Sequence, residues 1–154
     1  MPAEPPESLP FFVYGTLRTG GRNHAAHLAG HCAAVRPAVL EGAALHEGPG
    51  FPYAVPDRER RITGELITVR PGAYARVLAA LDLLEECRAD GTGLYVRRRM
   101  AVRPVERPDE GRVDAWTDPG AGPVDAWVYL AGPAAAARLR ARPALIRSGD
   151  WTRC

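Results

Sequence analysis

The 154-residue chain contains no lysine, and all 20 of its basic residues are arginine. Against 18 acidic residues this leaves a formal net charge of only +2, which is spread along the chain. Domains that bind nucleic acid usually concentrate basic residues on one surface, so this balance argues against a nucleic-acid partner. The densest basic run, Arg97-Arg98-Arg99, falls inside a strand-like segment and is typical of a solvated strand face.

Cysteines are few, and long apolar runs are missing. Cys32, Cys87 and Cys154 are widely spaced and odd in number, which excludes a disulfide framework and the spacing of a zinc knuckle. No stretch approaches the ~18 apolar residues that a membrane-spanning helix needs. The first ten residues are rich in proline and glutamate and lack the apolar core of a secretion signal. We therefore expect a cytoplasmic protein that does not contact a membrane.

Length and hydrophobic pattern predict one domain of the α+β class. We expect residues 1–9 to be a disordered leader and residues 10–154 to form a single domain. The pattern favours strands at 11–14, 51–55, 62–69, 94–102 and 124–130, and a shorter one near 113–116. Residues 33–46 are expected to form one strand or two, with a break at Gly42. It favours helices at 72–86 and 134–142, and a short one at 23–28. Because these elements lack a βαβ rhythm, we predict a small bent mixed β-sheet or β-barrel with flanking helices.

The helix expected at 72–86 places an acidic residue among its apolar ones. Its apolar stripe consists of Tyr74, Val77, Leu78, Leu81 and Leu84. At ~100° per residue, Glu85 falls near the middle of this stripe, while Asp82 lies to one side and Glu86 nearly opposite.

A carboxyl group at Glu85 is therefore expected to be partly buried at the C-terminus of a helix. Burial and the negative end of the helix dipole both raise the pKa of such a group. A pKa raised toward neutral suits a general acid/base. The structural alternative is that Glu85 pairs with an arginine, for instance Arg97, or turns to solvent as the helix end frays.

The loop after the first strand is a second candidate element. Tyr14-Gly15-Thr16-Leu17 follows a buried strand, so several of its backbone N–H groups lack a ladder partner, and Gly15 allows close approach to a ligand. Such a turn can hold a carboxylate or an oxyanion. The alternative is a simple turn that ends the strand.

The segment Leu94-Tyr95-Val96-Arg97 is the third. Alternation along a strand puts Tyr95, Arg97 and Arg99 on one face. If that face looks into a pocket, Tyr95 lines it near Glu85; otherwise it is an ordinary polar outer face.

Two other chemistries have weaker support. His24, His27 and His31 have helical spacing, but no carboxylate accompanies them and Gly30 interrupts the helix before His31. Cys87 lies close to Glu85, yet no histidine stands in a supporting context for a nucleophile.

Taken in order, these segments resemble the γ-glutamylcyclotransferase superfamily, in its AIG2-like or γ-glutamylamine cyclotransferase branch. The resemblance runs from about residue 11 to residue 131, and the closing Ser148-Gly149-Asp150-Trp151 also fits bacterial relatives. It rests on the following segments: Val13 to Arg18, Gly20, Asn23, Phe51-Pro52, Gly64-Glu65-Leu66, Leu81 to Glu85, and Leu94 to Arg97.

The resemblance implies a small bent β-barrel and a cofactor-free, metal-free enzyme, a transferase or lyase by class. Its substrate is a small γ-glutamyl molecule, which it converts to 5-oxoproline and a free amine or amino acid by intramolecular aminolysis. Glu85 matches the catalytic glutamate, and Tyr14, Gly15, Thr16 and Leu17 match a backbone-amide cradle for the substrate. Tyr95 is expected to orient the substrate.

Two departures from the family bear on substrate choice. Glu86 stands where the family usually has glycine, and the loop from Cys87 to Gly93 is long. The alternative function is a non-catalytic module on the same scaffold that binds a small molecule or a partner. The oligomeric state is left open.

Overall fold

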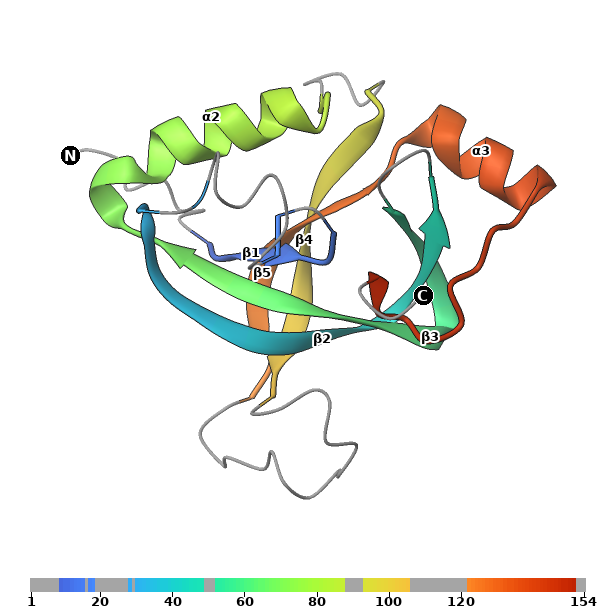
Figure 1. Cartoon of the computed structure of the whole chain (residues 1–154), viewed down its shortest axis with the longest axis horizontal. Coiled ribbons are helices and arrows are strands. Elements are labelled where there is room, and N and C mark those ends of the chain that lie inside the picture. Colours follow the sequence, from blue (N-terminus) through green and yellow to red (C-terminus); the bar gives the residue numbers. More distant parts are fainter. Residues whose placement is uncertain are drawn as a thin grey trace.

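Five strands close into a barrel in the computed structural model of the chain (Figure 1). The structure describes residues 9–15, 17–18, 28, 30–48, 52–87, 93–105 and 122–151. The strands are β1 (Phe11–Val13), β2 (Cys32–Glu47), β3 (Pro52–Val69), β4 (Tyr95–Pro104) and β5 (Val124–Ala131). They follow the order β1-β3-β2-β4-β5 around the barrel; β1 and β5 run parallel, and the other pairs are antiparallel.

In the described part of the chain, two α-helices flank the barrel. A 3-10 turn, η1 (Pro71–Ala73), leads into α2 (Tyr74–Leu84), and α3 (Pro133–Ala141) follows β5. Figure 1 shows α2 along one side of the barrel and α3 beside the end of the β2–β3 hairpin. The prediction of a small mixed α+β barrel with flanking helices is confirmed. Among the described helices, none has the length and apolar character needed to cross a membrane.

Strand β3 is longer than the sequence pattern predicts. Residues 51–55 and 62–69 were expected to be separate strands, but both belong to β3. The pairing of β3 with β2 is nevertheless interrupted, because the register jumps from Arg61 to Pro56 on β3 and from Glu41 to Ala43 on β2. Gly42, at this jump, has a φ of 85°, so it bends β2 at a bulge instead of ending it.

The strands bury apolar residues on both faces. One cluster fills the inside of the barrel, and its largest fully buried members are Phe12, Leu40, Leu45, Ile62, Val102 and Val128. The other lies between the barrel wall and the helices and includes Phe11, Ile67, Tyr74, Val77 and Leu81. The neighbours Phe11 and Phe12 point to opposite sides, as strand alternation requires.

Helix α2 buries the stripe that its sequence predicts. Tyr74, Val77 and Leu81 are buried, and Leu78 and Leu84 pack partly buried against the same cluster. The helix ends with Glu85 as its C-cap. The next two residues close a Schellman motif: the Glu86 N–H donates to the Leu83 carbonyl at 3.1 Å, and the Cys87 N–H donates to the Asp82 carbonyl at 2.8 Å.

Glu86 occupies the position of this motif at which glycine is favoured. Its φ is 49°, the only positive φ of a non-glycine residue in the described part of the chain. We expect Glu86→Gly to raise the free energy of unfolding by about 0.5–1 kcal/mol, because the left-handed conformation strains a residue with a Cβ. The midpoint of urea unfolding at unchanged m-value measures this. Glu86→Gln, which keeps the Cβ, is the control and should leave the midpoint unchanged; a lower midpoint for Glu86→Gly contradicts the assignment.

The C-terminal segment at residues 146–150 returns to the barrel, and we call it the strap. The Ile146 N–H donates to the Leu45 carbonyl at 2.7 Å, and the Thr63 N–H donates to the Gly149 carbonyl at 2.7 Å. Asp150 is buried and forms an ion pair with Arg18, with 2.7 Å between Oδ1 and Nη1. The strap is therefore tied to the loop that follows β1.

Several predicted elements lie outside the described residues. They are the leader except Leu9, the helix at 23–28 except Leu28, and the strand near 113–116. Leu9 is held against the barrel, because its carbonyl accepts a hydrogen bond from the Tyr74 hydroxyl at 2.6 Å.

Candidate active site

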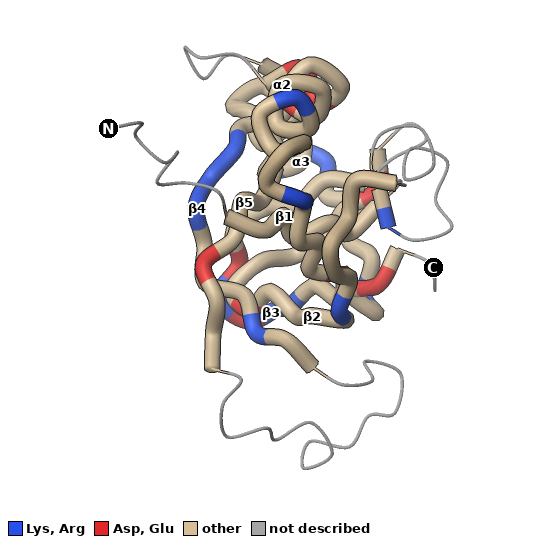
Figure 2. The backbone as a smooth tube through the Cα atoms, turned by 90° about the vertical axis from the view of Figure 1, so that its left-hand side faces the viewer, with Lys and Arg blue, Asp and Glu red and all other residues tan. Residues whose placement is uncertain are grey.

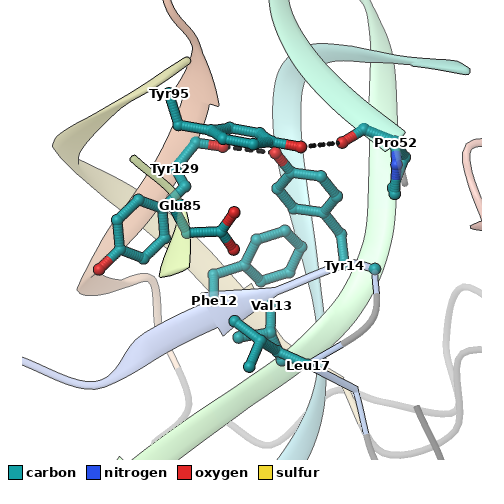
Figure 3. A pocket seen from close by; sticks show the side chains of 9 residues that line it. Phe12, Val13, Tyr14, Leu17, Pro52, Glu85, Tyr95 and Tyr129 are labelled. Atoms are coloured by element: carbon teal, nitrogen blue, oxygen red, sulfur yellow. Dashed lines mark hydrogen bonds between the residues drawn. The ribbon is translucent and has the colours of Figure 1, made fainter. Parts of the chain in front are cut away.

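A pocket opens where the end of β1 meets the start of β4 and the end of α2 (Figure 3). About 350 Å³ of space surrounds its lining atoms, its open mouth included. Its lining comes from four strands, one helix end and the loop after β1: Phe12, Val13, Tyr14, Gly15, Leu17, Pro52, Glu85, Tyr95 and Tyr129. Of these lining residues, Glu85 alone carries a charge.

Glu85 points its carboxyl group into this pocket, toward the rings of Tyr14 and Phe12 (Figure 3). Burial raises the pKa of Glu85 from 4.5 to about 7. The sequence predicted a raised pKa from burial and the helix dipole together; burial is the cause that acts here. Within the described part of the chain, the Glu85 carboxyl forms no ion pair and no hydrogen bond.

Three tyrosines surround Glu85 but direct their hydroxyl protons elsewhere. The Tyr14 hydroxyl donates to the Tyr129 carbonyl at 2.5 Å, and the Tyr95 hydroxyl donates to the Pro52 carbonyl at 2.7 Å. The Tyr129 hydroxyl donates to Asp82 Oδ1 at 2.7 Å. Each phenol has one proton, so none of the three is left to stabilise the charged form of Glu85.

These tyrosines also stay protonated at neutral pH. Burial raises the pKa of Tyr14 well above its ordinary value, and the Glu85 carboxylate raises it further. Burial likewise raises the pKa of Tyr95, with Tyr14 and Glu85 adding to the effect. Around pH 7, Glu85 is therefore the group among the lining residues that exchanges protons.

Arg97 does not pair with Glu85. Its Nε donates to Asp82 Oδ1 at 2.9 Å and its Nη2 to Asp82 Oδ2 at 3.3 Å. Its guanidinium carbon also lies 4.3 Å from the centre of the Trp127 ring. The alternative in which Glu85 pairs with Arg97 is therefore wrong, because Arg97 pairs with Asp82 instead.

The shared strand face predicted for Tyr95, Arg97 and Arg99 divides into a pocket wall and a charged outer surface. Tyr95 is buried and lines the pocket, whereas Arg99 is exposed and pairs with Asp125 at 2.8 Å. Figure 2 shows the arginine run as a continuous basic stretch of β4. Because Asp82 and Asp125 pair with two of its three members, this stretch is a weak surface for polyanions.

The loop after β1 contributes three of the four predicted cradle residues to the pocket. Tyr14, Gly15 and Leu17 line it, and the Arg18 N–H donates to the Gly15 carbonyl at 3.0 Å, which makes a turn. A Cβ on Gly15 would lie 2.9 Å from Pro52 Cδ, so only glycine fits this approach. Thr16, the fourth member of the predicted cradle, lies outside the described residues.

The structure gives no support to the two weaker alternatives, a histidine metal site and a Cys87 nucleophile. No group of three His, Cys, Asp or Glu side chains suits a metal ion in the described ranges, and His24 and His27 lie outside them. Burial raises the pKa of Cys87, which works against the thiolate that a nucleophile needs.

Sequence reasoning missed Pro52, Phe12, Val13 and Tyr129 as lining residues. Tyr129 reaches the pocket because it pairs with Arg97 in the β4–β5 register. The only sequence signal for Tyr129 is its place within a predicted strand. The sequence of that strand does not show which residue lies opposite Tyr129 on the neighbouring strand.

The sequence matches the family described as gamma-glutamyl cyclotransferase, AIG2-like, over residues 11–153. No curated protein sequence matches the chain. Among solved structures, an AIG2-like protein from Mus musculus is 27% identical, with a TM-score of 0.59. The match covers 82% of this chain and 81% of the mouse protein.

Two more distant structures share the fold. YkqA from Bacillus subtilis is 23% identical with a TM-score of 0.60; the match covers 94% of this chain but 40% of YkqA. A glutathione-specific gamma-glutamyl cyclotransferase from yeast is 12% identical with a TM-score of 0.55, and the match covers 80% of this chain and 68% of the yeast protein.

Proposed function

Because the chain belongs to the gamma-glutamyl cyclotransferase, AIG2-like family, we propose that it converts a small γ-glutamyl compound to 5-oxoproline and releases the attached amine or amino acid. The observation that carries this proposal is Glu85, a carboxyl group with a pKa of about 7 that points into a pocket beside the loop after β1. A group with such a pKa is divided between its acid and base forms at neutral pH, so it can both accept and return a proton.

The proposed reaction begins with the α-ammonium group of the substrate beside the Glu85 carboxylate. Glu85 accepts one proton, and the resulting amine attacks the γ-carbonyl carbon of the same molecule to close a five-membered ring. Since nucleophile and electrophile belong to one substrate, the enzyme mainly has to hold the conformer in which the two atoms meet.

Collapse of the tetrahedral intermediate completes the reaction. The bond from the γ-carbon to the leaving nitrogen breaks as that nitrogen takes the proton held by Glu85. The ring nitrogen passes its second proton through the restored carboxylate, so that 5-oxoproline, a protonated amine and ionised Glu85 remain. Two protons leave the attacking nitrogen and two reach the leaving nitrogen, which balances the step.

The other lining residues have supporting roles in this proposal. Backbone N–H groups of Gly15, Thr16 and Leu17 hold the substrate carboxylate or the developing oxyanion. Tyr14 and Tyr95, whose hydroxyls are fixed by backbone carbonyls, form rigid walls that orient the substrate. No step needs a metal ion or an organic cofactor.

The test is release of 5-oxoproline from a panel of γ-glutamyl amines and γ-glutamyl amino acids, followed by liquid chromatography. The proposal expects turnover of at least one member with stoichiometric release of the amine. If no compound is turned over, yet one shifts the melting temperature, the scaffold is a binding module and the proposed activity is wrong.

A further inference from the structure

Asp82 lies three residues before Glu85 on α2 and accepts hydrogen bonds from two strands of the barrel. The Tyr129 hydroxyl of β5 donates to its Oδ1 at 2.7 Å. The Arg97 guanidinium of β4 donates to both of its oxygens, at 2.9 Å from Nε and at 3.3 Å from Nη2. Because Arg97 and Tyr129 are register partners, one carboxylate holds both of them.

The Tyr129 hydroxyl is close enough to Glu85 to be affected by its charge. The Tyr129 ring lines the Glu85 pocket, yet Figure 3 shows its hydroxyl directed away from the Glu85 carboxyl. Burial is the largest cause that raises the pKa of Tyr129, the hydrogen bond to Asp82 comes next, and the Glu85 carboxylate adds to them. The phenol therefore interacts with both carboxylates but gives its only proton to Asp82, the one outside the pocket.

The charge of Arg97 is balanced at the same place. The side chains of Arg97 and Asp82 are only 23% and 26% exposed. Charges interact more strongly in such a site than in water, because the effective dielectric constant is lower. Residues three apart on a helix have Cβ atoms about 5–6 Å apart, so a guanidinium that lost Asp82 would act on Glu85 from one helical turn away. Its charge would favour the ionised form of Glu85 and lower the pKa of that carboxyl.

Further titratable side chains that interact with the charge of Glu85 come from β1, β3 and β4: Tyr14, Tyr53 and Tyr95. Two of these hydroxyls donate to backbone carbonyls, and the third is bonded to Arg138 of α3. On the loop after β1, Arg18 pairs with the strap, and Glu86 beside Glu85 is exposed. None of these contacts uses the Asp82 side chain, so its loss acts first on the two donors that it holds.

We propose that Asp82 is a positioning residue for the acid/base Glu85. By binding a guanidinium and a phenol, it keeps a cation and a hydrogen-bond donor away from the Glu85 carboxyl, which then meets the substrate ammonium group as its cation. Asp82 is not among the residues that line the pocket, so it acts through Arg97 and Tyr129 and does not touch the substrate. This inference rests on the proposed cyclotransferase activity and adds a residue that sustains it.

The test is a ¹³C NMR titration of Glu85 in Asp82→Asn, a variant that keeps the shape and one acceptor oxygen but removes the charge that balances Arg97. We expect the Glu85 midpoint to fall by about 1 pH unit or more, because a nearby opposite charge shifts a carboxyl pKa by about 1–3. Asp82→Ala, which also frees the Tyr129 hydroxyl, should lower the midpoint at least as far. The pH at which kcat/KM reaches half of its upper plateau should fall with it.

Two controls separate this role from a structural one. Asp125→Asn removes the partner of Arg99 on the same pair of strands, where both side chains are about half exposed, and should leave the Glu85 midpoint unchanged. Adding Arg97→Gln to Asp82→Asn removes the unbalanced cation and should return the midpoint most of the way to its wild-type value. A variant that merely loosened α2 would lower kcat at every pH without moving the midpoint.

The titration follows Glu85 without turnover, so the two proposals fail separately. An unchanged midpoint in Asp82→Asn and Asp82→Ala, or a lowered midpoint that Arg97→Gln does not restore, overturns the role of Asp82 and leaves the cyclotransferase proposal in place. A midpoint that falls and is restored, in a protein that releases 5-oxoproline from no γ-glutamyl compound, supports the effect of Asp82 on Glu85 and overturns the cyclotransferase proposal.

Discussion

Glu85→Gln should lower kcat for 5-oxoproline release by about 10²- to 10⁴-fold, the usual contribution of a general acid/base. The amide keeps the size and shape of the side chain but cannot accept the proton of the substrate ammonium group. Without that transfer the α-nitrogen has no lone pair for ring closure. Single-turnover assays at pH 8 measure the loss directly, and KM should change much less than kcat.

The control for this variant is its neighbour in the chain. Glu86 is exposed and does not line the pocket, so Glu86→Gln should keep kcat within about 3-fold of the wild type, as expected for a surface change. Full activity of Glu85→Gln, or equal losses in both variants, contradicts the catalytic role of Glu85.

Glu85→Gln should raise the stability of the folded state, although it lowers activity. The pKa of Glu85 is 4.5 when unfolded and about 7 when folded, so the folded state disfavours the ionised form. This cost is absent below pH 4.5, grows as pH rises, and is complete above pH 7. Because Gln never ionises, the free energy of unfolding of Glu85→Gln should exceed that of the wild type by about 3 kcal/mol at pH 8, and the difference should vanish at pH 4.

Asp150→Ala should lower the free energy of unfolding by about 3 kcal/mol, because it leaves the Arg18 guanidinium without its partner in a largely buried site. Both side chains of the pair are only 13% exposed. The pair joins the strap to the loop that carries Gly15 and Leu17, so kcat/KM should also fall as the pocket wall loosens. Urea unfolding and the 5-oxoproline assay measure the two effects.

The chain offers a matched control and a double-mutant test. Asp125 pairs with Arg99 at a similar distance, but the two side chains are 48% and 53% exposed, so Asp125→Ala should cost less than about 1 kcal/mol. The double variant Arg18→Ala, Asp150→Ala should lose clearly less than the sum of the two single variants, since no charge is then left unpaired. Additive losses would show that the two residues are not coupled.

The features that the sequence predicts best depend on neighbours along the chain. Glu85 could be placed because helical periodicity relates it to Tyr74, Val77 and Leu81 within one element, and those three are buried as expected. The turn after β1 could be located for the same reason, since Gly15 follows a short apolar strand directly.

The features that the sequence does not predict depend on strand register and on barrel closure. The sequence offered Arg97 as a partner for Glu85, and its pairing with Asp82 instead follows from where β4 crosses the helix. Tyr129 is brought to the pocket by its pairing with Arg97 across the β4–β5 register, and Pro52 by its approach to Gly15 and the hydrogen bond that its carbonyl accepts from Tyr95. Such contacts join segments distant in sequence, which local periodicity does not encode.

The central claim is that Glu85 is a desolvated carboxyl group that titrates near neutral pH and accepts the substrate proton. A ¹³C NMR titration of the side-chain carboxyl groups, with Glu85→Gln to assign the resonance, tests it most directly. We predict a midpoint near pH 7 that coincides with the pH at which kcat/KM reaches half of its upper plateau. A Glu85 midpoint near pH 4.5, the value of a solvated carboxyl group, would contradict the account.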